Sequence, residues 1–373
     1  MRLVAVLCLI VTTAFAWSEP HSIRGIVKDS ETQEPLPFAH VVIGQVISLT
    51  NIDGEFVIDP HESTDRVPLQ VSVMGYELST TKIENPSKFL TVYLKSSTMH
   101  LDEVTIVSGD ALMHNVFNRF HLNYEMSQKN MLGYYKEDLL DLDSMYYLAE
   151  GIVDIYVPPN VEFEHALVNP IRTRKKVFRE MDEDHIYVKG NASDMAQSSI
   201  WRKGSFLNPK NRKNYDFIYA GASNIGDKEV LIVEFEPKNS KGDTQGKIYI
   251  EEETLAVVKL EYHPLIKKNS FWTSVSWVEE YYEKNGLYEL FRVSYSGSWE
   301  EFDTDYTYNA LLVVNESRVT SDLPEDIFLL NEHHSFFHEA QEDFSDSFWD
   351  GYNYIKLDLA SAHLLGEVGN GPE

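Results

Sequence analysis

The amino-acid sequence predicts a mainly β protein with two parts. The first is an N-terminal β-sandwich of the seven-stranded type, and the second is a large curved antiparallel sheet with one or more packed helices. Three observations support this prediction. Short apolar runs separated by turn residues fill residues 22–95. Longer alternating runs dominate after Gly133. Between them, one stretch changes to the period of a helix.

The first sixteen residues have the features of a secretory signal peptide. A basic start at Arg2 precedes an apolar stretch, Leu3 to Phe15, which is too short to span a bilayer comfortably. We expect cleavage after Ala16, with retention as an uncleaved anchor as the alternative. The only cysteine, Cys8, lies in this stretch, so the mature chain would have no disulfide and no thiol chemistry. No later segment approaches the roughly 20 apolar residues of a membrane helix.

Turn residues divide the N-terminal part into short predicted strands, namely 22–28, 38–44, 48–58, 67–77 and 89–95. The run 48–58 contains Asn51, Asp53 and Gly54. These residues lack the twelve-position spacing of oxygen ligands and the flanking helices of a calcium loop. They instead predict a structural hairpin turn, in which Gly54 takes the positive φ and Phe56 points into the core.

A set of residues recurs in order along this part: Gly25, Val27, Asp29, Thr32, the run Pro35 to Ala39, Val41, Ile43, Thr50, Asn51, Asp53, Gly54, Phe56, Val71, Ser72, Met74, Gly75 and Tyr76. Their order and spacing resemble the carboxypeptidase regulatory-like domain. That domain is a small transthyretin-like sandwich of exported proteins, and it also precedes some outer-membrane receptors. The resemblance implies an appended stabilising or binding domain without catalysis.

An amphipathic helix is predicted over residues 110–126. Its apolar residues, including Leu112, Val116 and Phe120, recur at steps of three and four, and Ser108 begins a capping sequence. We therefore expect five segments along the chain. They are the signal peptide 1–16, the sandwich 20–96, a linker 97–109, the helix and large β-domain 110–345, and a C-terminal segment 346–373.

The second part contains long alternating runs, which are 145–157, 185–190, 229–237, 246–263, 271–299 and 309–314. Asn285-Gly286 lies between two aromatic-rich runs and predicts a hairpin. The segment 246–262 resembles, more weakly, the sheet of periplasmic lipoprotein-carrier proteins. That resemblance implies a curved sheet closed by a helix around an apolar cavity.

The formal charge of −27 excludes nucleic acid as a general partner, because an acidic surface repels phosphates. One segment departs from this balance. Residues 172–213 hold eleven basic and five acidic side chains. This excess predicts an anion-binding face for lipid head groups or an acidic glycan. Alternatively, the basic residues pair with the acidic remainder of the chain. The candidate residues are Arg172, Arg174, Lys175, Lys176, Arg202 and Lys203.

No motif for catalysis or for a cofactor is found in the sequence. The histidines His333, His334 and His338 are the best metal candidate, and we interpret them as incidental surface residues because a zinc site needs fixed geometry and a second shell. Carboxylate pairs such as Glu279-Glu280 arise by chance in a chain this acidic. We therefore predict no catalytic, metal or cofactor residue.

These observations predict an exported, non-enzymatic binding or scaffolding protein of the Gram-negative envelope, in the periplasm or at the outer-membrane surface. Its partner would be an envelope protein, a glycan or a lipid. One alternative is a carrier or sensor that holds an apolar ligand in the curved sheet. A cavity filled by Trp272, Trp277, Tyr281 and Phe291 would argue against that alternative. Another alternative is a hydrolase using a carboxylate or histidine cluster.

Overall fold

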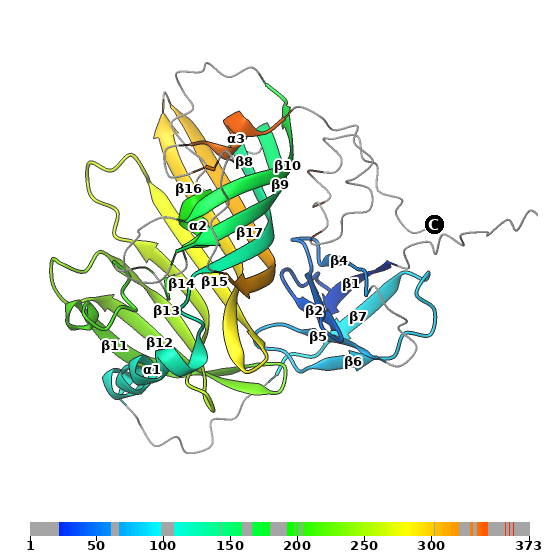
Figure 1. Ribbon diagram of the computed structural model, residues 1–373, viewed down its shortest axis with the longest axis horizontal. Coiled ribbons are helices and arrows are strands. Elements are labelled where there is room, and N and C mark those ends of the chain that lie inside the picture. Colours follow the sequence, from blue (N-terminus) through cyan, green and yellow to red (C-terminus); the bar gives the residue numbers. More distant parts are fainter. Residues whose placement is uncertain are drawn as a thin grey trace, which may run out of the picture.

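The computed structural model contains two small sheets followed by one large sheet, which confirms the mainly β prediction (Figure 1). Its described residues are 22–60, 67–97, 108–142, 144–158, 166–179, 192–197, 199–200, 202, 204–301, 303–320, 329–330, 334–341, 355, 358 and 361. The predicted signal peptide lies outside these residues and stays a prediction. The boundaries expected for the five segments stay predictions as well.

Seven strands form the N-terminal sandwich. One sheet has the order β4-β1-β7, and the other has the order β3-β2-β5-β6. Strand β1 pairs antiparallel with β4 and parallel with β7. Apolar side chains from both sheets, among them Val27, Val41 and Phe56, form the core between them. The strands are β1 (Ile23–Asp29), β2 (His40–Ile43), β3 (Val46–Leu49), β4 (Glu55–Ile58), β5 (Leu69–Ser72), β6 (Ser79–Thr81) and β7 (Leu90–Leu94).

The turn at Asn51, Asp53 and Gly54 connects β3 to β4. The Asn51 side chain accepts hydrogen bonds from the backbone N–H groups of Asp53 and Glu55, at 3.0 and 2.9 Å. Gly54 has a φ of +73°, and a Cβ there would lie 2.7 Å from the Val27 carbonyl oxygen. The two strands belong to different sheets, so the expected hairpin is wrong. The turn instead carries the chain from one layer of the sandwich to the other.

Ten antiparallel strands form the large sheet, in the order β10-β9-β8-β17-β16-β15-β14-β13-β12-β11. Asn285 and Gly286, with φ of 55° and 82°, form the predicted hairpin between β15 and β16. The strands are β8 (Lys129–Asp141), β9 (Ser144–Val157), β10 (Leu167–Val177), β11 (Tyr215–Ile225), β12 (Lys228–Pro237), β13 (Thr244–Glu251), β14 (Val257–Pro264), β15 (Ser274–Lys284), β16 (Leu287–Glu301) and β17 (Thr304–Val319).

Helices cover one face of this sheet, which we call the helix side. The predicted helix is α1 (Gly109–Asn123), and the Ser108 hydroxyl caps it by accepting from the Ala111 N–H. The short helices α2 (Ala192–Ala196) and α3 (Phe336–Glu339) contribute to the same core. A 3₁₀ turn at Arg212–Asn214 leads into β11. The apolar residues of the helix side form the largest buried cluster of the described chain.

The sandwich docks on the opposite face of the large sheet, which we call the sandwich side. Leu49 of the sandwich packs with Phe291 and Val313 of the sheet. A second contact joins Gly75 to the β11–β12 turn, where the Gly75 N–H donates to the Asn224 carbonyl at 2.8 Å. Both contacts hold the sandwich beside the large sheet, as Figure 1 shows.

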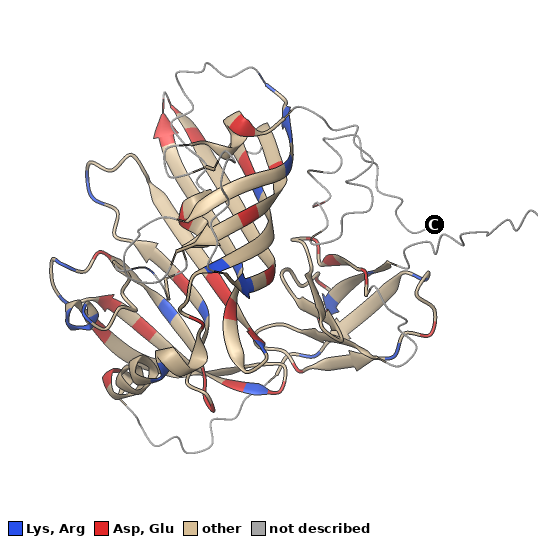
Figure 2. Ribbon diagram, viewed as in Figure 1, with Lys and Arg blue, Asp and Glu red and all other residues tan. Residues whose placement is uncertain are grey.

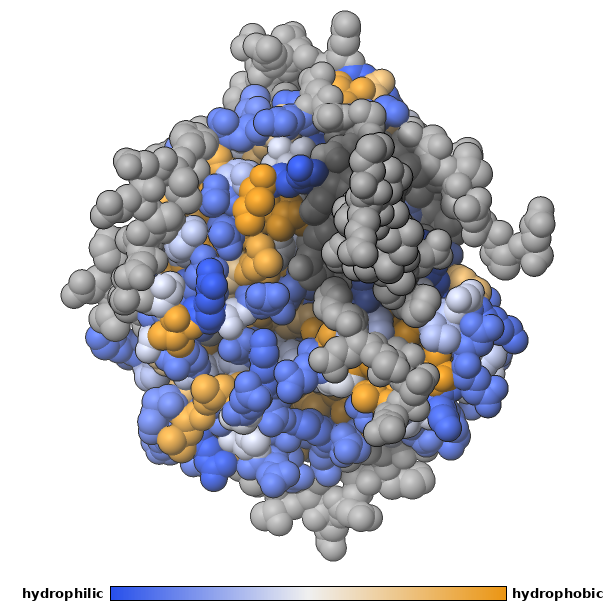
Figure 3. All heavy atoms as spheres, turned by 45° about the vertical axis from the view of Figure 1, so that its right-hand side comes forward, coloured by the Kyte–Doolittle hydropathy of each residue, from blue (hydrophilic) through white to orange (hydrophobic). Residues whose placement is uncertain are grey.

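The distribution of acidic residues along the fold agrees with the acidic composition. Acidic residues are spread over most elements of the fold (Figure 2). Hydrophobic residues appear as small separate patches among hydrophilic ones on the face drawn in Figure 3. Among the helices in the described ranges, none has the length and hydropathy needed to cross a membrane.

Four strands were not predicted. They are β6, β8, β10 and β11. Strand β10 carries Arg172 to Lys176 and is the last strand in the order of the sheet, a position where polar residues are tolerated. Its outer side forms backbone hydrogen bonds at Val168 with Leu330 and at Lys175 with Gln341. The run 185–190, which was predicted as a strand, lies outside the described residues.

Candidate ligand-binding cleft

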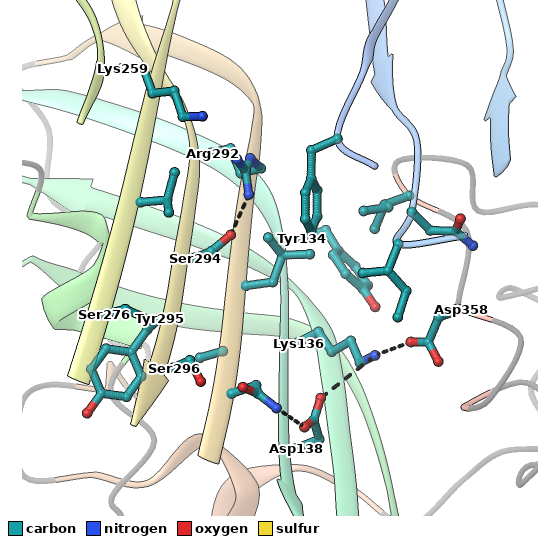
Figure 4. A pocket seen from close by; sticks show the side chains of 18 residues that line it. Tyr134, Lys136, Asp138, Lys259, Ser276, Arg292, Ser294, Tyr295, Ser296 and Asp358 are labelled. Atoms are coloured by element: carbon teal, nitrogen blue, oxygen red, sulfur yellow. Dashed lines mark hydrogen bonds and ion pairs between the residues drawn. The ribbon is translucent and has the colours of Figure 1, made fainter. Parts of the chain in front are cut away.

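A cleft of about 530 Å³ lies between the sandwich and the sandwich side of the large sheet (Figure 4). This volume is within the range of small-molecule sites, about 300–1,000 Å³. Strands β8, β14, β15, β16 and β17 line one wall, and the sandwich together with Ile355 and Asp358 lines the other. Its residues are Phe38, Asn51, Ile52, Tyr134, Lys136, Asp138, Lys259, Ser276, Val278, Arg292, Ser294, Tyr295, Ser296, Asn309, Ala310, Leu311, Ile355 and Asp358.

Lys136 lies at one end of the cleft between two carboxylates. Its Nζ is 2.8 Å from Asp358 and 3.8 Å from Asp138. Asn309 donates to the Asp138 carboxylate at 2.9 Å. Burial alone would lower the pKa of Lys136, but the two carboxylates outweigh it and leave that pKa raised. Lys136 is therefore charged and already paired.

Glu280 is the centre of a second charged group, on the sheet wall beside the cleft. Arg292 donates to both of its carboxylate oxygens, at 2.9 and 2.8 Å. His40 of the sandwich and Lys259 lie 3.5 and 3.9 Å from it. Burial alone would raise the pKa of Glu280, yet Arg292 and His40 hold it well below its usual range. The Arg292 guanidinium also stacks on Phe38, 4.1 Å from the ring centroid, so this group ties the sandwich to the sheet.

Apolar and hydroxyl side chains occupy the remaining lining of the cleft. Ile52 and Leu311 contribute apolar surface from opposite walls, and Ile52 is 57% exposed. Ser276 and Ser296 also line it. Within the described residues, neither serine hydroxyl has a hydrogen-bond partner. The cleft therefore offers apolar contact and uncommitted hydroxyls, while its charges already have partners.

On the helix side, the described side chains form a packed core. Phe336 and Phe337 of α3 pack on Tyr135 and Tyr147, with ring centroids 4.7 and 4.0 Å apart. Beneath them, the carboxylate of Glu137 is fully buried and accepts hydrogen bonds from the hydroxyls of Tyr135 and Tyr308, at 2.7 and 2.8 Å. The Phe337 N–H donates to its other oxygen at 3.0 Å. Burial raises the pKa of Glu137 to about 7, despite these hydrogen bonds.

A second buried carboxylate of the helix side, Glu279, has the same kind of partners. It accepts from the Ser199 N–H at 2.8 Å, from the Ser199 hydroxyl at 2.6 Å and from the Tyr262 hydroxyl at 2.7 Å. The Tyr281 hydroxyl also donates to it. Glu279 and Glu280 are adjacent in the chain and face opposite sides of the sheet because side chains alternate along a strand.

The four aromatic residues named against the carrier hypothesis do not fill one cavity. Tyr281 belongs to the helix-side core, and Trp272 and Trp277 pack partly buried against it. Phe291 lies on the sandwich side with Leu49. The open volume described above lies on the sandwich side, which differs from the cavity that the carrier resemblance implies.

The predicted basic residues are dispersed in the structure. Arg174 is buried and paired with Glu150. The Lys175 ammonium faces α3, where it donates to the Phe337 carbonyl at 3.0 Å. Arg202 donates to the Tyr262 hydroxyl at 3.2 Å on the helix side. The pairing of Arg174 agrees with the alternative that these residues neutralise acidic groups of the same chain.

The other three predicted basic residues are Arg172, Lys176 and Lys203. Arg172 is exposed, Lys176 is half-buried, and both lie on β10. Lys203 lies outside the described residues. An anion-binding face therefore stays a prediction, and its members on the described chain do not form one continuous surface.

The metal candidate is only partly described. His334 precedes α3 and His338 lies within it, while His333 lies outside the described residues. Among the residues that the structure describes, no group of three or more potential metal-ligating side chains occurs.

Sequence reasoning missed the cleft residues. Ile52 follows Asn51 in the turn, so the turn interpreted as structural also contributes to the sandwich wall. Arg292 lies between Phe291 and Val293, and a charged residue inside an apolar run was the available signal. No local pattern indicates that these positions face each other across the cleft.

Comparison with protein families confirms the resemblance of the sandwich. Residues 23–106 match the family described as the CarboxypepD_reg-like domain. This match covers the N-terminal part of the chain alone. No curated protein matches the chain significantly.

Solved structures similar to the chain include a domain described as an outer membrane lipoprotein-sorting protein from Vibrio parahaemolyticus. Its TM-score is 0.32 at 8% identity, covering 58% of this chain and 94% of that chain. A DUF1329 family protein from Desulfovibrio piger has a TM-score of 0.30 at 10% identity, covering 58% and 96%. The MucA/MucB complex of Pseudomonas aeruginosa has a TM-score of 0.18 at 7% identity, covering 57% and 99%. The description of the first of these structures corresponds to the weaker resemblance, and TM-scores this low carry no inference about function.

Proposed function

We propose that the protein is a non-enzymatic binding protein of the Gram-negative envelope and that its ligand occupies the cleft between sandwich and sheet. The observation that carries this proposal is the cleft of about 530 Å³, formed jointly by the two parts of the chain. An apolar pocket with a few convergent polar groups is the usual form of a ligand site. The CarboxypepD_reg-like match and the predicted signal peptide support the envelope location.

The side chains of the cleft indicate the class of ligand. Lys136 and Arg292 are already paired with carboxylates, so a strongly anionic ligand would have to compete with Asp358 and Glu280. Ser276 and Ser296 can donate and accept hydrogen bonds, and Ile52 and Leu311 offer apolar contact. The ligand is therefore an uncharged molecule or segment that combines apolar surface with hydroxyl or amide groups.

Filling the cleft tests this proposal. The protein is purified from its own cells, and the retained ligand is measured by native mass spectrometry. We expect wild type to carry added mass and Ser276→Trp to lose it, because the indole would occupy the cleft. Ser240→Trp, on the exposed β12–β13 turn, is the matched control and should keep the ligand. Equal ligand retention by the Ser276→Trp variant, with its melting temperature unchanged, would remove the cleft as the site.

A further inference from the structure

The loop between β14 and β15 departs from the acidic character of the chain. No acidic residue occurs between Glu261 and Glu279, whereas the whole chain has 59 acidic residues among 373. The loop carries Lys267 and Lys268, which are both exposed. Within the described residues, neither lysine ammonium group has an ion-pair or hydrogen-bond partner. In Figure 2 this loop projects from the left side of the large sheet with blue at its tip.

Large apolar side chains flank the two lysines and are also exposed. Leu265, Ile266 and Phe271 are 44%, 41% and 44% exposed. The Phe271 ring also packs against the buried Trp299, 5.1 Å between centroids, whereas Leu265 and Ile266 are not part of any buried cluster of the described residues. Apolar side chains with adjacent lysines are typical of segments that enter the interface of a bilayer with anionic lipids.

The base of the loop is held firmly while its tip projects. The Leu265 N–H donates to the Asp243 carbonyl at 2.7 Å, and the Thr273 N–H donates to the Ser298 carbonyl at 2.8 Å. The Trp272 ring packs edge-on against the buried Trp299, 5.5 Å between centroids. Gly297 makes room for it, since a Cβ there would lie 2.6 Å from the Trp272 ring. A fixed base reduces the ordering cost when the tip binds a surface.

We propose that this loop docks the protein on an anionic lipid surface, with Leu265 and Ile266 entering the interface and Lys267 and Lys268 contacting lipid phosphates. Charge complementarity selects this partner, because the loop is basic in a chain of formal charge −27. Glu300 and Glu301 at the end of β16 would be repelled by such a surface, so the contact is confined to the projecting tip.

The experiment places a polarity-sensitive dye on the loop tip of the full chain. Asn269→Cys in a Cys8→Ser background gives a single labelling site, and Lys284→Cys at the β15–β16 hairpin is the control site. We expect a blue shift at position 269 with vesicles of phosphatidylglycerol and phosphatidylethanolamine. We expect none with phosphatidylcholine vesicles and none at position 284. High salt should reverse the shift.

Substitutions of paired lysines then measure how much the loop contributes to the affinity for these vesicles. Lys267→Gln with Lys268→Gln should weaken binding roughly 25-fold, because each lysine near an anionic surface contributes about a fivefold effect. The exposed sandwich lysines, changed as Lys82→Gln with Lys88→Gln, should leave the affinity unchanged. The proposal is overturned by no shift at position 269, by an equal shift with phosphatidylcholine, or by equal affinity of the two lysine pairs. A shift produced by envelope proteins but not by vesicles would also overturn it.

Discussion

The two faces of the large sheet bury carboxylates in different ways. On the helix side, Glu137 and Glu279 accept hydrogen bonds from hydroxyl and backbone groups. On the sandwich side, Glu280 and Glu150 are paired with Arg292 and Arg174. Neutral donors satisfy a carboxyl without introducing a second charge into the core, whereas a guanidinium fixes the ionised form. Burial therefore favours the protonated form of Glu137, whereas Arg292 and His40 hold Glu280 in its ionised form.

Glu137 and Glu280 therefore contribute to stability with opposite dependences on pH. The pKa of Glu137 is raised to about 7, so its contribution is fully present below its ordinary value of 4.5 and is lost as the pH rises through 7. The pKa of Glu280 is lowered well below 4.5, so its contribution is present above 4.5 and is lost as the pH falls.

The largest expected effect comes from breaking the charged pair on the sandwich side. Glu280→Gln leaves the buried Arg292 guanidinium without its carboxylate, which should reduce the free energy of unfolding by about 3–5 kcal/mol. Urea denaturation at neutral pH measures this loss. Adding Arg292→Met should recover part of it, because the unpaired charge is then removed. A loss in the single variant too small to measure would contradict the assigned role of the pair.

Removing the titratable carboxyl of Glu137 on the helix side should increase the free energy of unfolding, in contrast to the loss expected for Glu280→Gln. Glu137→Gln mimics the protonated carboxyl, so the variant should match wild type below pH 4.5. Above pH 7 it should be more stable by roughly 3 kcal/mol, the free energy that corresponds to the raised pKa. The measurement is the difference in unfolding free energy between the two proteins across this range. A difference that does not change with pH would show that Glu137 titrates normally.

The contact between His40 of the sandwich and Glu280 should contribute less to the free energy of unfolding than the Glu280–Arg292 pair does. His40 lies 3.5 Å from Glu280 and packs edge-on against Phe291, 5.1 Å between ring centroids. His40→Ala should reduce stability by about 1–2 kcal/mol and increase hydrogen exchange in β2. The exposed His263, changed to Ala, is the control and should alter neither quantity. Unchanged exchange in β2 would mean that His40 does not hold the sandwich on the sheet.

The smallest effect is expected from one hydrogen-bond donor of Glu137. Tyr308→Phe removes a hydroxyl at 2.8 Å from the carboxylate and should cost about 1 kcal/mol. Since this hydroxyl lowers the pKa of Glu137, its loss should raise that pKa further. The cost should therefore be greater above pH 7 than below pH 4.5. Urea denaturation of wild type and of the Tyr308→Phe variant, below pH 4.5 and above pH 7, measures the two costs. A larger loss of stability at the acidic pH would contradict the expected rise in the pKa of Glu137.

The sequence predicted the architecture better than the site. Alternation and turn residues are local signals, so the sandwich, α1 and the Asn285-Gly286 hairpin could be anticipated. Strand β10 could not, because an edge strand tolerates the polar residues that were interpreted as a basic face. The sandwich crossover at Gly54 was interpreted as a hairpin, since local turn chemistry does not reveal which sheet the next strand joins.

The cleft depends on contacts between distant residues. Glu279-Glu280 was interpreted as a chance pair, and alternation alone would place the two carboxylates on opposite faces. Their partners Ser199 and Arg292, and the presence of Ile52 and Leu311 in one cleft, follow from the register of the sheet and the docking of the sandwich. None of these relations is encoded in a short stretch of sequence.

The most direct test of the account is a crystal structure of the protein purified from its own cells with its ligand retained. We predict ligand density in the cleft, in contact with Ile52 of the sandwich and with Ser276 and Ser296 of the sheet. Density on the helix side, among Tyr135, Tyr147 and Phe336, would contradict the assignment of the two faces and favour a carrier that opens its core.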